Sequence, residues 1–365
     1  MDGSIEGRGE ARRQDPVGVG IVGSGFMGRT HAAAYAAAAE AGAANRLLGV
    51  FDTGAARRGG NTRDERVARP GVGEDDASPL ERVPRVASYA DLLSDPEVEL
   101  VSICTPTETH VDLAIAALEA GKHVLLEKPV ALASAEVQRL LEVERKSAGW
   151  CLPAMCMRFW PAWTWLLEVV ANERFGAVES ATFRRVGPAP DWSQSFYADE
   201  GRSGGALFDL HVHDVDIVVA LFGVPAEVHA SGSTQHLTAC YGFDEGPRHV
   251  TAEGGWAHAA GSPFRMHFTV AFERATADFA LGRDPELWIA GEGAASPAAS
   301  SSSGAASGPA GPVPVAVPEG DGYQHQARHA LEVVRGLRRP SVSLDQALAV
   351  TQVLERERAS LRNAP

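Results

Sequence analysis

Residues 19–28 read VGIVGSGFMG, and this stretch decides the fold of the first part of the chain. An alanine-rich helical pattern over 26–41 follows at once, so the GxGxxG motif stands between a predicted strand and a predicted helix. Gly23 allows a tight turn, Gly25 lets a ligand approach the backbone, and Gly28 lets the helix pack closely on the strand. Because the free N–H groups at such a helix start bind phosphate, the stretch predicts a Rossmann domain for a dinucleotide.

An acidic residue stands where the ribose of such a dinucleotide would lie. The second predicted strand ends in Asp52, whose carboxylate would accept the ribose hydroxyls of NAD and repel the 2′-phosphate of NADP. Arg57 and Arg58 follow closely and could pair with that phosphate, although arginines on a helix surface are more often solvated. The sequence therefore favours NAD and leaves NADP open. We expect the cofactor to contact Gly23, Ser24, Gly25, Phe26, Met27, Gly28 and Asp52.

Short apolar runs alternate with helical patterns from Val17 to about residue 150, which is typical of βαβ units and a parallel, doubly wound sheet. The predicted strands are 17–22, 46–51, 99–104 and 123–127, and the predicted helices are 26–41, 53–68, 88–94, 108–120 and 134–148. Three prolines and two glycines within 69–84 predict a surface loop.

The pattern changes beyond residue 158 to alternating apolar and polar residues, which predicts a mostly antiparallel open sheet with one solvated face. Predicted strands are 178–186, 226–233, 248–256 and 264–272, and predicted helices are 206–222, 324–336 and 344–361. We therefore expect an α/β Rossmann domain over 15–157 and an α+β domain for substrate binding and oligomerisation over 158–365. The low-complexity stretch 293–312 is predicted as a mobile loop, and residues 1–14, which contain IEGR, as a tag-like or disordered tail.

Composition excludes several classes of partner. The chain is 45% apolar and carries a formal charge of −14, with no basic stripe to bind nucleic acid. No uninterrupted apolar run is long enough to cross a membrane, and the four cysteines lack CxxC spacing, which favours a cytoplasmic location. An open sheet face would expose apolar residues unless it were paired, so we expect a homodimer or homotetramer.

Two further segments carry a family resemblance. Residues 102–110 read SICTPTETH and residues 120–129 read AGKHVLLEKP. Together with Arg158-Phe159, Phe175-Gly176, Gly204-Gly205, Asp209 and His213, they closely resemble the glucose-fructose oxidoreductase, inositol dehydrogenase and MocA (Gfo/Idh/MocA) family over nearly the whole chain.

The resemblance implies an enzyme that transfers a hydride between NAD or NADP and a secondary hydroxyl of a sugar, inositol or related polyol. It implies a catalytic set of Lys128, Asp209 and His213. It also implies that the cofactor side of the cleft is lined by Thr105, Pro106, Thr107, His110, Glu127 and Lys128. An NAD-dependent glycoside hydrolase and a non-catalytic dinucleotide sensor are the alternatives within the family, although a sensor has no need of an acid–base set.

The residues themselves are compatible with these roles. Lys128 follows a strand of the parallel sheet, at the edge where ligands bind, and Pro129 forces it into an extended conformation and makes a cis peptide bond possible. Asp209 and His213 are four residues apart in a helical pattern, so they would share a face and suit proton transfer. The same spacing equally fits a capping aspartate and a structural histidine.

The motif DLHVHDVD at 209–216 also raises the question of a metal site. On one helix His211 would point away from Asp209, so these groups would not converge, and we predict no metal. His211 would either touch substrate or pack under the sheet. Polyhydroxylated substrates are bound by guanidinium groups and aromatic faces, so the candidate contacts are Arg158, Arg185, Trp192, Tyr197 and His211.

Overall fold

The computed structural model describes residues 15–54, 78–190, 194–292 and 311–363. These form two compact units that interleave along the chain. Unit 1 comprises residues 1–160, 191–203 and 320–351, and unit 2 comprises residues 161–190, 204–319 and 352–365. The predicted tail at 1–14 and the residues Arg57, Arg58 and Trp192 lie outside the described residues, as do most of the predicted helix 53–68, loop 69–84 and loop 293–312.

Unit 1 is built on a five-stranded parallel sheet in the order β2-β1-β3-β4-β5. The strands are β1 (Val17–Val22), β2 (Asn45–Phe51), β3 (Leu100–Ile103), β4 (His123–Leu126) and β5 (Cys151–Pro153). The chain reverses its direction of winding between β1 and β3, and ligands of open α/β sheets bind at such a switch point. The predicted Rossmann fold is therefore confirmed, although β5 was not predicted.

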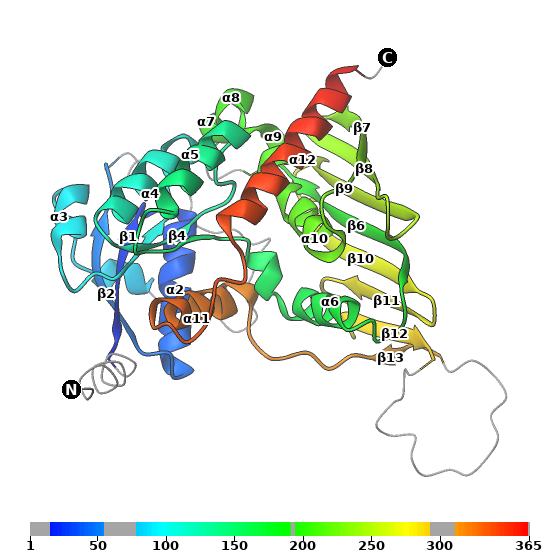
Figure 1. Cartoon of the computed structure of the whole chain (residues 1–365), viewed down its shortest axis with the longest axis horizontal. Coiled ribbons are helices and arrows are strands. Elements are labelled where there is room, and N and C mark those ends of the chain that lie inside the picture. Colours follow the sequence, from blue (N-terminus) through cyan, green and yellow to red (C-terminus); the bar gives the residue numbers. More distant parts are fainter. Residues whose placement is uncertain (1–14, 55–77, 191–193, 293–310, 364–365) are drawn as a thin grey trace, which may run out of the picture. The chain divides into compact units, whose positions relative to one another are not determined.

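Helices cover both faces of this sheet (Figure 1). One face packs on α4 (His110–Glu119) and α5 (Ser134–Glu144), and the other on α2 (Phe26–Glu40) and α11 (Gly322–Val334). Both layers are apolar, so each strand is buried on both sides, as a parallel sheet requires. The remaining short helices of the unit are η3 (Pro79–Arg82), α3 (Tyr89–Ser94), η4 (Thr107–Thr109), η5 (Cys156–Phe159), α7 (Gln194–Tyr197) and α8 (Glu200–Ser203).

Unit 2 is an eight-stranded sheet in the order β13-β12-β11-β10-β6-β9-β8-β7, in which all neighbours are antiparallel except β6 and β9. The strands are β6 (Val178–Pro188), β7 (Glu227–Ser233), β8 (His236–Gly242), β9 (His249–His258), β10 (Arg265–Phe272), β11 (Ala275–Ala280), β12 (Leu287–Gly291) and β13 (Val313–Pro314). The predicted mostly antiparallel sheet is confirmed, with β8, β11, β12 and β13 added to the four predicted strands.

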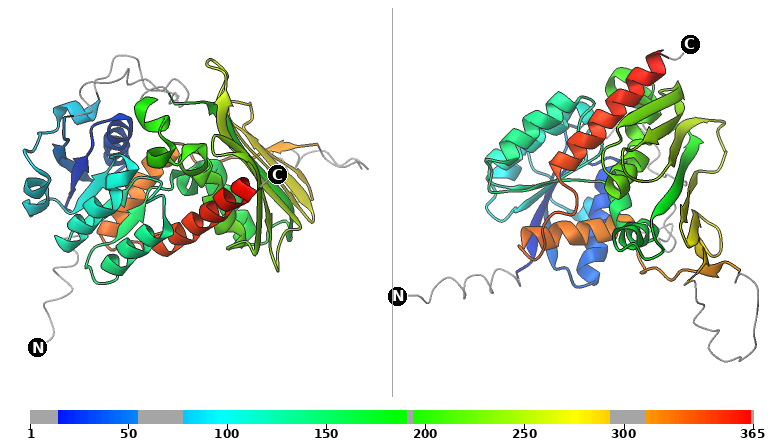
Figure 2. Two further views of the ribbon diagram at one scale, coloured as in Figure 1. Left: turned by 90° about the horizontal axis from the view of Figure 1, so that it is seen from above. Right: turned by 45° about the vertical axis from the view of Figure 1, so that its right-hand side comes forward.

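The helices of unit 2 lie on one face of its sheet (Figure 2). They are α6 (Pro161–Ala171), α9 (Gly205–Asp209), α10 (Val212–Phe222) and the part of α12 (Leu344–Asn363) from Gln352 onward. Buried and more exposed residues alternate along β10, so its apolar side chains face the helices. Within the described residues, no helix is both long and apolar enough to span a membrane.

Candidate active site

The glycine-rich turn has the geometry that a dinucleotide requires. Gly23 adopts φ +93°, and a Cβ atom there would lie 2.5 Å from the carbonyl oxygen of Cys104. A Cβ atom at Gly28 would lie 2.0 Å from the Gly23 carbonyl oxygen, so strand and helix could not pack as they do. At Gly25, by contrast, a Cβ atom would meet no protein atom within 4 Å. The backbone at Gly25 is thus open to a ligand, and α2 starts there without a side-chain cap on its N–H groups.

Asp52 lies at the end of β2, beside this turn. Its Oδ2 accepts hydrogen bonds from the amide of Ser24 at 2.7 Å and the Ser24 hydroxyl at 2.6 Å, and its Oδ1 accepts the Gly54 amide at 2.8 Å. Burial raises the pKa of Asp52, but these hydrogen bonds and the charge of Arg85 outweigh burial and lower it. The carboxylate therefore stays ionised and can accept ribose hydroxyls.

Arg85 is a residue that sequence reasoning missed. It forms an isolated parallel bridge with Val50 at the outer side of β2, and its charge acts on Asp52. The arginines expected to act near Asp52 were Arg57 and Arg58, which lie outside the described residues. The sequence did not predict that the chain pairs with β2 at Arg85, because a single bridge residue leaves no strand pattern.

Residues after β3 and β4 meet at the same sheet edge. His110 joins them, since its Nδ1 contacts the carbonyl oxygen of Pro129 and its Nε2 that of Thr105, each at 2.8 Å. Burial lowers the pKa of His110, although both carbonyl contacts favour the protonated ring. The Lys128–Pro129 peptide bond is cis. His110 is thus buried and holds the two loops together, while Lys128 is half-buried beside it.

A buried polar group beneath Glu127 was also missed. Glu127 accepts from His31 of α2 at 2.9 Å, and the second nitrogen of His31 contacts Ser102 of β3 at 2.7 Å. All three side chains are buried. The signal for His31 was weak, because a histidine in an alanine-rich helix carries no pattern of its own.

Asp209 and His213 are both partly exposed in unit 2, whereas Lys128 belongs to unit 1. The predicted continuous helix over 206–222 is wrong, because α9 ends at Asp209 and α10 begins at Val212. Leu210 and His211, which join the two helices, keep right-handed helical dihedral angles. The proximity of Asp209 and His213 stays a prediction.

His211 explains the break in the helix. The ring is fully buried and contacts Glu357 of α12 at 3.2 Å and the hydroxyl of Tyr241 at 3.3 Å. It packs on β9 so closely that a Cβ atom at Gly254 would lie 2.6 Å from its Nδ1. Burial lowers the pKa of His211, but the charge of Glu357 outweighs burial and raises it. Of the two roles considered, His211 thus packs under the sheet.

Arg185 is similarly placed in the core of unit 2. Its guanidinium binds both oxygens of Asp214, at 3.0 and 2.9 Å, and lies 5.9 Å from the centre of the Trp163 ring. It is 3% exposed, so the predicted substrate contact finds no support in its placement. Of the other candidates, Arg158 in η5 and Tyr197 in α7 are both half-buried in unit 1.

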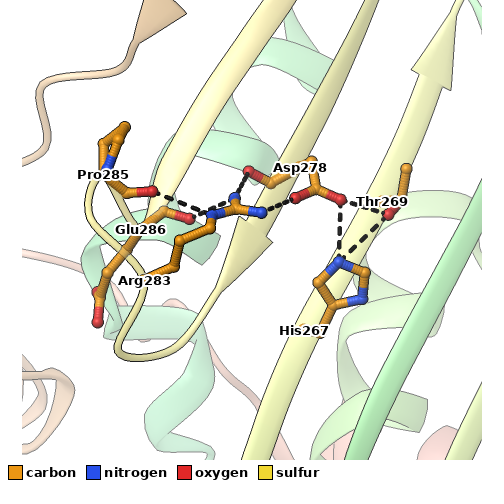
Figure 3. Close-up of polar contacts among 6 residues, drawn as sticks. All are labelled: His267, Thr269, Asp278, Arg283, Pro285 and Glu286. Atoms are coloured by element: carbon orange, nitrogen blue, oxygen red, sulfur yellow. Dashed lines mark hydrogen bonds and ion pairs between the residues drawn. The ribbon is translucent and has the colours of Figure 1, made fainter. Parts of the chain in front are cut away.

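A second polar cluster lies on the face of the unit 2 sheet opposite the helices (Figure 3). Asp278 of β11 accepts from His267 at 2.9 Å, Thr269 at 2.7 Å and Arg283 at 2.5 Å. These partners satisfy the carboxylate within the cluster. Among the described residues, no group of three or more His, Cys, Asp or Glu side chains is arranged to hold a metal ion.

Comparison with known proteins supports this reading of the two units. The model of the oxidoreductase family with an NAD-binding Rossmann fold (GFO_IDH_MocA) matches residues 17–153, and the model of the GFO/IDH/MocA C-terminal domain matches residues 163–294. A myo-inositol 2-dehydrogenase from Thermotoga maritima is 33% identical over 144 residues, 39% of this chain and 42% of that protein. A UDP-N-acetylglucosamine 3-dehydrogenase from Acidithiobacillus ferrooxidans is 32% identical over 214 residues, 58% and 57% of the two chains.

The alignment with an uncharacterised oxidoreductase of Rhizobium meliloti, at 35% identity, covers 43% of this chain and 46% of that protein, so the matched part is under half of the relative's length. Solved structures agree over more of the chain. A levoglucosan dehydrogenase in complex with NADH and levoglucosan superimposes with a TM-score of 0.76 at 20% identity, covering 95% of this chain and 98% of that one. The Acidithiobacillus enzyme gives a TM-score of 0.71 at 22% identity, covering 94% and 97%. At this identity the likeness establishes the fold alone.

Proposed function

This chain belongs to the Gfo/Idh/MocA family of NAD-binding oxidoreductases, and we propose from that premise that it is a dehydrogenase acting on a secondary hydroxyl of a sugar, inositol or related polyol. One observation carries the proposal. The open turn at Gly25, the ionised Asp52 and Lys128 all follow strands that end at the same edge of the parallel sheet. That edge is where open α/β sheets bind their ligands.

NAD is the proposed cofactor, with NADP as the less favoured alternative. The N–H groups at the start of α2 would bind the pyrophosphate, and Asp52 would accept the ribose hydroxyls. When bound, NAD supplies a nicotinamide ring that takes up the hydride. Thr105 and Glu127 follow β3 and β4, and we propose that they lie with Lys128 on the nicotinamide side of the site.

The proposed acid–base set consists of Lys128, Asp209 and His213. His213 would accept the hydroxyl proton of the substrate, Asp209 would orient and stabilise the charged ring, and the Lys128 ammonium would hydrogen-bond the same oxygen as it becomes negative. The family resemblance and the partial exposure of all three side chains support the proposed set.

The experiment is a spectrophotometric screen of sugars and polyols with NAD and NADP in parallel, followed by the Lys128→Ala variant on the best substrate. We expect this variant to lose about 100-fold or more in turnover, because a preorganised donor to a developing oxyanion is removed. The Kd for NADH, measured by calorimetry, should stay within about threefold, since the phosphate and ribose contacts remain. Activity that survives the substitution would refute the role of Lys128.

The same assay separates the alternative chemistry. A glycoside hydrolase that uses its cofactor transiently would cleave glycosides at constant absorbance at 340 nm, whereas a dehydrogenase accumulates NADH with turnover. Relatives whose names report action on inositol and on a nucleotide sugar favour the dehydrogenase. We also propose a homodimer or homotetramer and, from the spacing of its cysteines, a cytoplasmic location.

A further inference from the structure

A buried ion pair lies directly beneath the backbone of Lys128. His31 Nε2 lies 2.9 Å from Glu127 Oε1, and Glu127 Oε2 accepts the Lys128 amide at 3.2 Å. The other nitrogen of His31 lies 2.7 Å from the Ser102 hydroxyl. His31 and Glu127 are 2% and 5% exposed. Three separate elements, α2, β3 and the end of β4, thus hold one residue of the proposed acid–base set.

The contact with Glu127 requires a proton on Nε2 of His31. The Glu127 carboxylate can only accept, whereas the Ser102 hydroxyl, which accepts from Tyr35 at 3.5 Å, can either donate to Nδ1 or accept from it. Burial lowers the pKa of His31, but interactions with Cys104 and Glu127 outweigh burial and raise it to about 10. Burial raises the pKa of Glu127, but the hydrogen bond and charge of His31 outweigh it and lower that pKa. Both directions favour the pair in its ionised form, with a net charge of zero.

Several other groups act on the same carboxylate. The charges of Lys128 and His110 both favour the ionised form of Glu127, and the charge of Glu127 in turn acts on Tyr323 of α11. Burial lowers the pKa of His110, and burial together with nearby acidic groups keeps the Tyr323 hydroxyl protonated. Of these groups, His31 is the one whose ring contacts the Glu127 carboxylate, whereas Lys128 contacts it through its backbone amide.

We propose that His31 is a positioning residue for Lys128, which holds Glu127 against the Lys128 amide and cancels the negative charge that Glu127 would otherwise place beside the Lys128 ammonium. The inference rests on the proposed role of Lys128 in the reaction. Because His31 lies on the helix whose N-terminus faces the proposed pyrophosphate site, the pair also ties that helix to the Lys128 loop.

The chain is suited to a direct test, because it contains only three lysines, Lys122, Lys128 and Lys146. Lysine labelled with ¹³C at Cε would give three signals, and their shifts follow the protonation of each amine. Lys122→Arg and Lys146→Arg assign two signals and leave the third to Lys128. The measurement needs no substrate and no turnover.

We expect His31→Gln to raise the titration midpoint of Lys128 by about 0.5 to 1.5 pH units, because an unopposed carboxylate near the amine favours the ammonium. Buried carboxylates are ionised above about pH 9, so the charge of Glu127 is present where lysine titrates. His31 loses its own proton through about pH 10, so the two proteins should differ most on the acid side of the Lys128 titration. The double variant His31→Gln with Glu127→Gln removes both charges and should return the midpoint to within about 0.3 units of the unsubstituted protein. Ser102→Ala is a milder variant that weakens the charged form of His31 and should give a smaller shift of the same sign.

Lys122→Gln is the matched control for loss of a buried cation in the same sheet. Lys122 donates to the carbonyl oxygens of Asp95 and Val98 at the opposite end of β4, so this variant should lower the melting temperature and leave the Lys128 midpoint unchanged. An unchanged midpoint in His31→Gln and Ser102→Ala, or a raised midpoint that Glu127→Gln fails to restore, would overturn the inference. A folded protein with the expected midpoints but with no NADH formation on any polyol would overturn the proposed function alone.

The two hypotheses are joined by a kinetic measurement. If the Lys128 ammonium assists the reaction, kcat/KM should decline at a higher pH in His31→Gln than in the unsubstituted protein. In the double variant the decline should occur at the original pH again. A decline at an unchanged pH while the Lys128 signal moves would retain His31 as the positioning residue and reject Lys128 as the group that stabilises the substrate oxygen.

Discussion

At the scale of single residues, we propose that Asp52 determines the preference for NAD over NADP. Replacement by Asn removes the charge that the Ser24 and Gly54 hydrogen bonds keep in place. We expect the Kd for NAD to rise about 10- to 100-fold, because a charged acceptor for hydroxyl groups contributes about 1.5–3 kcal/mol. The Kd for NADP should rise less or fall, since repulsion of its 2′-phosphate is relieved. Calorimetry with both cofactors tests this, with the exposed Asp91→Asn as the control.

A second prediction at this scale concerns the pH dependence of stability. The pKa of His31 is about 10 in the folded protein against an ordinary value of 6.5, so the folded protein binds the proton of His31 more tightly than the unfolded chain does. Its contribution to the free energy of unfolding is therefore complete below pH 6.5 and is lost as the pH rises through about 10. Melting temperatures measured from pH 6 to 10.5 should decline, and His31→Gln should be less stable at pH 6 but decline less. Parallel curves for the two proteins would contradict this account.

At the scale of elements, the buried group around Glu357 sets the turn between α9 and α10. Glu357 accepts a hydrogen bond from the Tyr241 hydroxyl at 2.8 Å and lies 3.2 Å from His211. His211 stands between Asp209 and His213 in the sequence. Glu357→Gln leaves His211 buried without that anion, which should cost about 3 kcal/mol or more of stability. Turnover should fall as well, because the turn that places Asp209 and His213 is loosened, while the Kd for NADH stays unchanged.

Tyr241→Phe is the matched variant for this prediction. It removes the hydrogen bond that the Tyr241 hydroxyl donates to Glu357 and the contact of that hydroxyl with His211, but it leaves the pair of His211 and Glu357 intact. It should therefore cost about 1–2 kcal/mol, less than Glu357→Gln. The pKa of His211 is raised, so the stabilisation that it provides is complete below its ordinary pKa of 6.5 and declines as the pH rises above it. A Glu357→Gln protein of low stability but full turnover would show that the turn does not depend on this contact.

The elements differ in how well the sequence predicts them. The strands and helices near the glycine-rich turn were predicted to within a few residues, because a glycine turn, an apolar run and an acid in order allow few alternatives. The strands β8, β11, β12 and β13 of unit 2 were missed, because no strong pattern marks them or the turns that precede them. The break at His211 was missed for a different reason, since it depends on Glu357, 146 positions along the chain, and local propensity carries no information about such a partner.

The residues of the candidate site that follow strands could be predicted from the sequence, whereas the roles of the buried charged residues could not. The glycines, Asp52 and Lys128 follow strand ends, so the order of the chain places them. Arg185 and His211 looked like polar groups available to a substrate, yet both balance buried carboxylates. Buried charges are kept only with partners, and the partners of these two residues come from other elements.

At the scale of the whole molecule, the sequence predicted a homo-oligomer because one face of the second sheet would expose apolar residues, and the structure shows a different surface there. The apolar side chains of unit 2 face its helices, and the other face of the sheet carries Ala271, Thr276, Thr269 and the Asp278 cluster (Figure 3). An exposed apolar face is therefore not what would drive assembly in the described residues. This face also carries Trp288, which is paired in register with Asp278 and lies under Arg283. No helix of unit 2 covers the face, so a second sheet could approach it (Figure 2).

We therefore expect light scattering to give a multiple of the 38.5 kDa chain mass. Ala271→Arg should shift the mass to that of one chain, because Ala271 lies in register with Ser180 and Thr276 on this face, and a long charged side chain there would keep a second sheet away. Ala120→Arg, at the exposed end of α4, should leave the mass unchanged. A single-chain mass for the unsubstituted protein would remove the assembly proposal, and an unchanged multiple in Ala271→Arg would move the interface to another surface. Neither outcome would alter the expected binding of NAD, because every residue proposed for that binding belongs to unit 1.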